Sequence, residues 1–235
     1  MTSAMESRAR LRGILAGDRA VRASSLFDPM SARIADELGI EVGLMGGSVA
    51  SLAVLGAPDL MVLTLTELAE QTRRVARAGR LCVLVDADHG YGNALNVMRT
   101  VEELAAAGAS GISIEDTLLP RGFGASSEAQ LLGIEEGLGK MKAAVRARGD
   151  TGMAVFARSS AHSIGSIDDA IRRFRAYEQS GVDALFIPGI KKREDLGVSR
   201  WWIEYTGIRS HPYKAVEDKL RQRERFGTGG QRRQP

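Results

Sequence analysis

The chain has 235 residues, a formal net charge of +3, and 44% hydrophobic against 26% charged residues; Cys82 is its single cysteine. A chain of this length buries a sizeable core, its composition excludes a disordered protein, and no apolar run approaches the roughly 18 residues of a membrane span. One thiol also excludes an internal disulfide, a cysteine-rich zinc site and an iron–sulfur cluster.

The predicted elements alternate along the chain between short β-rich apolar runs and longer stretches of helical periodicity. Six runs predict strands, at residues 21–26, 42–45, 81–85, 111–114, 153–157 and 184–188. Helices are expected between them, at residues 29–38, 65–78, 94–107, 135–147 and 167–180. This alternation is typical of parallel βα units in an α/β protein.

Polar side chains stand at or just after the ends of several predicted strands, namely Asp28, Asp86, Asp88, Glu115 and Arg158. A closed (β/α)8 barrel of the TIM type converges such residues on one face. An open doubly wound sheet would gather only the residues beside its switch point. We therefore favour the barrel and keep the doubly wound sheet as the alternative.

The barrel is expected to be incomplete. Six units use about 190 residues, so two more would need about 64, whereas 45 residues remain. We find no seventh or eighth strand in that remainder. The predicted organisation is a barrel domain over residues 1–196 and a divergent basic tail over residues 197–235, which is expected to be partly disordered.

The positive charge is concentrated in the last part of the chain. Residues 191–235 carry 12 Lys and Arg against 6 Asp and Glu, which leaves 20 against 23 in the first 190. Because no stacking platform or zinc motif accompanies it, the tail indicates a solvated end and no nucleic-acid partner. Nothing predicts a membrane partner, and residues 1–12 lack the apolar stretch of a secretion signal, which favours a cytoplasmic location.

The strongest local signal is the pair Asp86 and Asp88, which directly follows an apolar run and precedes two glycines. Hard carboxylate oxygens on a turning loop suit Mg²⁺, which takes few protein ligands and keeps several waters. The alternative is structural: the two acids would cap the next helix or pair with arginines.

Glu115 and Arg158 strengthen the interpretation as a metal site. Glu115 ends the next predicted strand, and neighbouring parallel strands lie roughly 5 Å apart, so its carboxylate is expected near the two aspartates. A divalent cation would offset their mutual repulsion. Arg158 ends the strand after that, and its planar guanidinium suits a substrate carboxylate; the alternative is a structural ion pair with Glu115.

Four further segments carry weaker signals. Gly47 and Ser48 offer backbone N–H groups and a hydroxyl for an anion, or else form a plain turn. Asp59 is a candidate outer acid that holds metal-bound water, or else an ordinary loop residue. His89 either donates to the site or lies exposed on its loop. Residues 121–124 form either a mobile lid or a plain connection.

Together these motifs resemble a known superfamily. The segment Asp86-Ala87-Asp88-His89-Gly90-Tyr91-Gly92, followed by Ile114-Glu115-Asp116, is similar to the phosphoenolpyruvate mutase/isocitrate lyase superfamily. Segments 27–33, 46–51, 92–97 and 115–120 look most like its oxaloacetate decarboxylase branch. The similarity runs from about residue 10 to about residue 195.

The resemblance implies a (β/α) barrel that assembles as a homotetramer and binds a 2-oxo acid through Mg²⁺. It would make Asp86 the direct metal ligand, with Asp59, Asp88 and Glu115 reaching the ion through water. The Gly47 amide and Ser48 would hold the substrate carboxylate from one side and Arg158 from the other. Lyase members carry a cysteine-containing loop that this chain lacks, which argues against cleavage of isocitrate or methylisocitrate.

The resemblance leads to three hypotheses. The first is Mg²⁺-dependent decarboxylation of oxaloacetate or a related 2-oxo acid to pyruvate and CO₂, with Asp86 and Arg158 as catalytic residues. The second is C–C bond cleavage or P–C mutase chemistry on a related 2-oxo or 2-hydroxy acid. The third is an inactive, truncated barrel that serves only in binding or assembly, because residues 197–235 match neither the last two strands nor the histidine that follows them in the decarboxylase branch.

Overall fold

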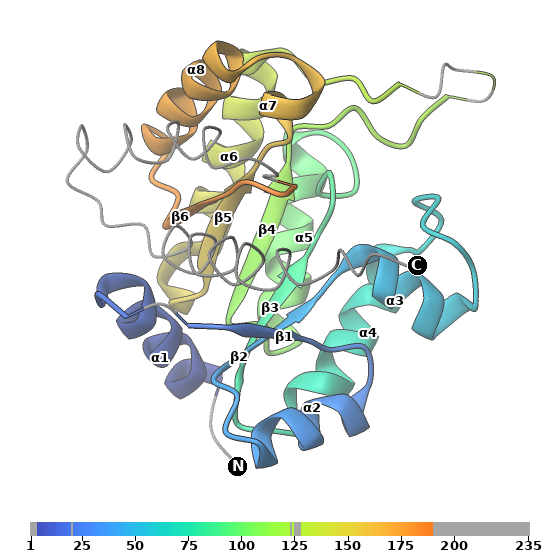
Figure 1. The fold of residues 1–235 in the computed structure, drawn as a ribbon, viewed down its shortest axis with the longest axis vertical. Coiled ribbons are helices and arrows are strands. Elements are labelled where there is room, and N and C mark those ends of the chain that lie inside the picture. Colours follow the sequence, from blue (N-terminus) through green and yellow to red (C-terminus); the bar gives the residue numbers. More distant parts are fainter. Residues whose placement is uncertain (1–3, 20, 123, 125–127, 190–235) are drawn as a thin grey trace, which may run out of the picture.

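Six parallel strands form a single sheet in which each strand lies beside its neighbour in the chain (Figure 1). They are β1 (Ala23–Ser25), β2 (Val42–Met45), β3 (Cys82–Asp86), β4 (Gly111–Glu115), β5 (Ala154–Arg158) and β6 (Ala184–Phe186). The computed structural model describes residues 4–19, 21–122, 124 and 128–189. The predicted boundary between residues 196 and 197, and the predicted tail, lie outside these ranges.

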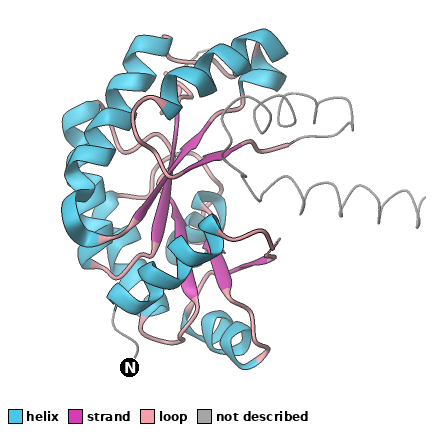
Figure 2. Ribbon diagram, turned by 90° about the vertical axis from the view of Figure 1, so that its left-hand side faces the viewer, coloured by secondary structure: helices cyan, strands magenta, loops and turns pink. Residues whose placement is uncertain are grey.

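The helices are α1 (Ala4–Ala16), α2 (Pro29–Glu37), α3 (Gly47–Leu55), α4 (Leu65–Ala76), α5 (Ala94–Ala106), α6 (Ile134–Arg148), α7 (Ala161–Ile164) and α8 (Ile167–Glu178), with a 3₁₀ turn η1 (Gly149–Thr151). Figure 2 shows the larger helices along one side of the sheet. Right-handed crossovers between consecutive parallel strands place helices on one face only, whereas a doubly wound sheet reverses its strand order. The sequential order therefore makes the described residues part of a (β/α)8-type barrel with six of its strands, and the doubly wound alternative is wrong.

All six predicted strands and all five predicted helices are present, with ends that differ by a few residues. The strands β3, β4 and β5 each end one residue later than predicted, on Asp86, Glu115 and Arg158. Each ladder continues past the apolar run, as the pairing of Glu115 with Arg158 demonstrates. Backbone hydrogen bonding between strands does not depend on side-chain polarity. The apolar pattern alone therefore placed the C-terminal ends of these three strands one residue too early.

Three helices were not predicted from the sequence. α3 has no polar face, since its sequence GSVASLAVL is apolar nearly all round and so lacks the period that reveals an amphipathic helix. α1 alternates arginines with small residues and shows no strong apolar stripe. α7 is a single turn of four residues.

The sheet separates two apolar layers. Outward-facing strand residues such as Val85, Ile112 and Val155 pack with the surrounding helices in the main core. The inner face forms a second cluster with α1, in which Leu11 packs with Val42, Cys82, Ala154 and Phe156. Because α1 contacts the starts of β3 and β5, it closes the N-terminal end of the strands and leaves the C-terminal end for polar side chains.

Within the described residues, β1 and β6 each have one unpaired edge. No helix in these ranges is long and apolar enough to cross a membrane.

Candidate active site at the C-terminal ends of the strands

The register of the sheet places three charged residues on its inner face. Asp86 at the end of β3 is opposite Ser113, and Glu115, two residues further along β4, is opposite Arg158 at the end of β5. Since side chains alternate between the two faces of a strand, Asp86, Glu115 and Arg158 all point inward. Three neighbouring strands thus bring these residues to one place at the end of the sheet that α1 does not close.

Arg158 contacts both carboxylates. One nitrogen of its guanidinium, Nη1, donates to Asp86 Oδ2, and Nε lies 3.4 Å from Glu115 Oε2. Both acids are buried, and the Arg158 side chain is 20% exposed. Arg158 Nε is buried without a hydrogen-bond partner in the described structure. The structural alternative for Arg158, an ion pair with Glu115, is therefore present. A closer ion pair joins Arg158 to Asp86, which is the arginine pairing that the structural alternative for the aspartates expected.

Three residues of the site were missed in the sequence. Ser113 Oγ donates to Asp86 Oδ1 at 2.9 Å, and Thr117 Oγ1 donates to Glu115 Oε2 at 3.0 Å. The guanidinium carbon of Arg158 lies 5.7 Å from the centre of the Phe186 ring, within the range of a cation–π contact. The alternation of β4 would have revealed Ser113, because it lies two residues before Glu115 on the same face.

Asp88 approaches the site from the loop after β3. Its backbone N–H donates to Asp86 Oδ1 at 3.4 Å, and its φ of 46° is in the left-handed region, which aspartate tolerates better than most residues. A Cβ at position 47 would lie 2.5 Å from both oxygens of the Asp88 carboxylate. Only glycine therefore lets this carboxylate lie against the first turn of α3.

The carboxylates shift one another's ionisation. Burial, then the charges of Asp86, Asp59 and Glu115, raise the pKa of Asp88 to about 8. Burial also raises the pKa of Glu115, against the opposing effect of Arg158. The pKa of Asp59 is raised by its partial removal from water and then by Asp86. Four acids share one guanidinium, so the site carries an excess of negative charge.

This donor set fits Mg²⁺. Carboxylate oxygens and water are its usual ligands. A divalent cation would offset the mutual repulsion that, after burial, raises the pKa values of Asp88 and Asp59. In the part of the chain that the structure describes, no three His, Cys, Asp or Glu side chains are grouped as direct ligands of one ion. An ion held directly by one carboxylate and through water by the others requires no such group.

The remaining predicted residues differ in how far they are buried. Gly47 is buried in the first turn of α3, whereas Ser48 next to it and Asp59 in the loop after α3 are exposed. His89 is only 8% exposed, so the exposed-loop alternative is wrong; burial, then the charge of Lys140, lowers its pKa to about 4. Asn93 caps α5, which removes the capping alternative for Asp86 and Asp88.

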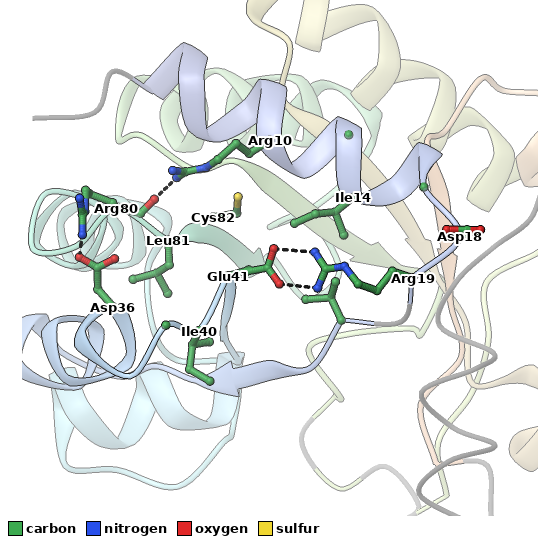
Figure 3. A pocket seen from close by; sticks show the side chains of 14 residues that line it. Arg10, Ile14, Asp18, Arg19, Asp36, Ile40, Glu41, Arg80, Leu81 and Cys82 are labelled. Atoms are coloured by element: carbon green, nitrogen blue, oxygen red, sulfur yellow. Dashed lines mark hydrogen bonds and ion pairs between the residues drawn. The ribbon is translucent and has the colours of Figure 1, made fainter.

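A cavity of about 640 Å³ lies at the opposite end of the sheet, beside α1 (Figure 3). Its charged side chains largely pair with one another: Arg19 makes two hydrogen bonds to Glu41, and Arg80 lies 3.5 Å from Asp36. None of the predicted site residues lines it. The residues predicted as the site therefore lie away from this cavity.

Comparisons with known proteins agree on one family. The family model of phosphoenolpyruvate phosphomutase matches residues 11–203. An oxaloacetate decarboxylase of Rhodopseudomonas palustris (strain BisA53) is 59% identical over 189 residues, and that of Bradyrhizobium diazoefficiens is 58% identical over the same length. In both cases the alignment covers 80% of this chain and 65% of the relative, so the chain spans just under two thirds of their length.

Solved structures resemble the fold. A 2,3-dimethylmalate lyase of the PEP mutase/isocitrate lyase superfamily superposes with a TM-score of 0.76 at 27% identity, over 88% of this chain and 69% of the lyase. A phosphonopyruvate hydrolase in complex with oxalate and Mg²⁺ gives 0.75 at 27% identity, over 96% of this chain and 88% of the hydrolase.

Proposed function

The chain belongs to the phosphoenolpyruvate phosphomutase family, and from this membership we propose that it is a Mg²⁺-dependent decarboxylase that converts oxaloacetate, or a related 2-oxo acid, to pyruvate and CO₂. The observation that carries the proposal is the contact of Arg158 with both Asp86 and Glu115 at the C-terminal end of the sheet. The choice of oxaloacetate comes from the relatives that are 58–59% identical and bear the name oxaloacetate decarboxylase.

Binding of the substrate uses opposite sides of the site in this proposal. The first backbone hydrogen bond of α3 is donated by Ala50 N–H to the Gly46 carbonyl, and no side chain caps the earlier N–H groups. These N–H groups, with the Ser48 hydroxyl, suit one carboxylate of a dicarboxylic acid. Arg158, whose side chain is 20% exposed at this end of the sheet, suits a substrate carboxylate from the other side.

The acids would hold the metal. Asp86 would bind Mg²⁺ directly, while Asp59, Asp88 and Glu115 would bind its water ligands, and Ser113 orients Asp86 by hydrogen bonding to its Oδ1. When bound, Mg²⁺ acts as a Lewis acid that draws electrons toward the 2-oxo group. The reaction itself breaks the C3–C4 bond, leaves its electron pair on pyruvate, releases CO₂ and returns one proton to C3.

The assembly and location of the protein belong to the same proposal. We expect a cytoplasmic homotetramer whose partner is a small 2-oxo acid. Within the described residues β1 and β6 each have an unpaired edge, and such edges favour association because they are a liability for an isolated chain.

The test is Mg²⁺-dependent release of CO₂ from oxaloacetate. Asp86→Ala is expected to abolish it, and Arg158→Ala is expected to lower kcat/KM by about 100-fold or more, because each removes a charged contact to the reacting complex. In addition, Mg²⁺ should raise the Tm of the unaltered protein and leave that of Asp86→Ala unchanged. Full activity in both variants would refute the proposal.

A matched control is Glu41→Gln. Glu41 is also an acid paired with an arginine, Arg19, but it lies at the opposite end of the sheet. This variant should keep its activity and its thermal response to Mg²⁺. Far-UV circular dichroism of all variants separates loss of function from loss of fold.

The two other hypotheses make different predictions in the same assay. C–C cleavage or P–C chemistry would appear as turnover of 2-hydroxy acids or phosphonopyruvate with no release of CO₂ from oxaloacetate. An inactive assembly subunit would turn over none of these compounds.

A further inference from the structure

Asp116, which directly follows Glu115, lies outside the candidate active site. It is fully buried and follows the last residue of β4. One of its oxygens, Oδ2, accepts three hydrogen bonds: from Ser159 Oγ at 3.0 Å, from Arg173 Nη1 at 3.1 Å and from Tyr177 OH at 2.7 Å. None of these four side chains had a role in the site predicted from the sequence.

The positions of these partners connect the network to the site. Ser159 directly follows Arg158, just as Asp116 directly follows Glu115. The parallel ladder between β4 and β5 ends at the pair Glu115 and Arg158. The hydrogen bond from Ser159 to Asp116 therefore joins the segments that follow β4 and β5, one residue beyond the point where backbone pairing stops.

Helix α8 fixes this junction from behind. Arg173 and Tyr177 lie four residues apart on one face of α8, and both donate to Asp116. Arg173 also donates to the Leu132 carbonyl at 2.8 Å, and the Leu132 N–H donates to the Asp116 carbonyl at 2.8 Å. The segment that returns from the loop after β4 is thus held at the same point.

We propose that Asp116 is a positioning residue that aligns the ends of β4 and β5, so that the Arg158 guanidinium stays between Asp86 and Glu115. The significance of this alignment for substrate binding rests on the proposed function. The alignment itself concerns only side chains of this chain. Asp116 contacts Ser159 just after the end of β5, and it contacts Tyr177 and Arg173 on α8.

The physical reason lies in the contacts of Arg158. Its Nε is 3.4 Å from Glu115 Oε2, slightly longer than a hydrogen bond, so a small displacement of the β5 end changes this contact markedly. A misplacement of about 1 Å in a positioning group is enough to lower catalysis substantially. A purely structural role for the network would change stability and leave the position of Arg158 as it was.

The experiment compares two serine variants. Ser159→Ala removes the link between the strand ends. Ser110→Ala is the matched control, because Ser110 is equally buried and donates to Ser7 Oγ at 3.0 Å, but precedes β4 at the opposite end. The readout is the NMR signal of Arg158 Nε–H in the protein without substrate, identified by its loss in Arg158→Lys.

We expect Ser159→Ala to shift the Arg158 signal and Ser110→Ala to leave it in place, even if both variants lose similar stability. In the decarboxylase assay, KM for oxaloacetate should rise roughly 10-fold in Ser159→Ala, with kcat changed less, because Arg158 would hold the carboxylate in ground and transition states alike. Tyr177→Phe, which removes a second donor to the same oxygen, should shift the signal in the same way.

An unmoved Arg158 signal in both Ser159→Ala and Tyr177→Phe would overturn the inference, as would an equal shift in Ser110→Ala. The NMR signal is measured without substrate. Absence of decarboxylase activity would therefore refute the proposed function, but it would not affect the conclusion about the position of Arg158.

Discussion

Asp88 has a carboxyl group that remains protonated far above the usual range of aspartate. Its pKa of about 8 arises from burial and from the charges of Asp86, Asp59 and Glu115. Between about pH 4 and pH 8, the folded chain without metal therefore binds more protons at this position than the unfolded chain. By linkage, this group makes the free energy of unfolding fall as the pH rises through that window.

Asp88→Asn should make the decline in the free energy of unfolding between pH 5 and pH 8 shallower, so that the variant gains on the unaltered protein as the pH increases. Urea unfolding in EDTA at a series of pH values measures this. Asp18→Asn, in an exposed loop, should follow the unaltered protein; if Asp88→Asn also follows it at every pH, the stated cause is wrong.

For single residues, the position of polar side chains at the ends of predicted strands was enough to predict much of the candidate site. Asp86, Glu115 and Arg158 were predicted as neighbours because each ends a strand, and the structure places them in contact. Asp28 shared this pattern but caps α2 together with Ser31, so its position after a strand has a local explanation. Position after a strand selects candidates, and the direction of the side chain decides among them.

At the scale of elements, α6 and α8 meet at a glycine. A Cβ at position 137 of α6 would lie 2.3 Å from the Tyr177 hydroxyl, whereas a Cβ at position 139 would meet nothing within 4 Å. Alanine normally stabilises a helix relative to glycine. The two glycines of one helix should therefore respond in opposite directions to the same substitution.

We expect Gly139→Ala to raise the free energy of unfolding by roughly 0.5–1 kcal/mol and Gly137→Ala to lower it by about 1–3 kcal/mol, because the added methyl displaces the Tyr177 hydroxyl. Chemical denaturation measures both. Equal stabilisation by the two substitutions would mean that Tyr177 moves aside freely, and would contradict a tight fit between α6 and α8.

At the scale of the whole molecule, α1 closes the end of the sheet opposite the site. Arg8 on this helix is 7% exposed and donates to three backbone carbonyls, those of Ala105, Ala109 and Thr151, at 2.6–3.0 Å. These carbonyls belong to the end of α5, the approach to β4, and η1. One side chain thus ties the N-terminal helix to parts of the chain about 100 to 140 residues away.

Arg8→Met should lower the free energy of unfolding by about 2–4 kcal/mol, because hydrogen bonds from a charged group are lost and three carbonyls lose their donor. Arg10→Met, on the same helix, loses one bond at an exposed position and should lower it by less than about 1 kcal/mol. Thermal and urea unfolding test the difference. The kcat/KM of folded Arg8→Met should remain unchanged, since Arg8 lies far from Arg158; a large loss of kcat/KM would contradict the separation of the two ends.

The sequence by itself determined the βα alternation, the positions of six strands and five helices, and the charged residues that end β3, β4 and β5. These features depend on local periodicity and on the chemistry of neighbouring residues, which one chain displays directly. The choice between a barrel and a doubly wound sheet became definite only through strand order, which is a property of pairing between distant segments. The tertiary structure alone decided the network around Asp116, because Ser159, Arg173 and Tyr177 lie 43 to 61 residues further along the chain and no local pattern links them.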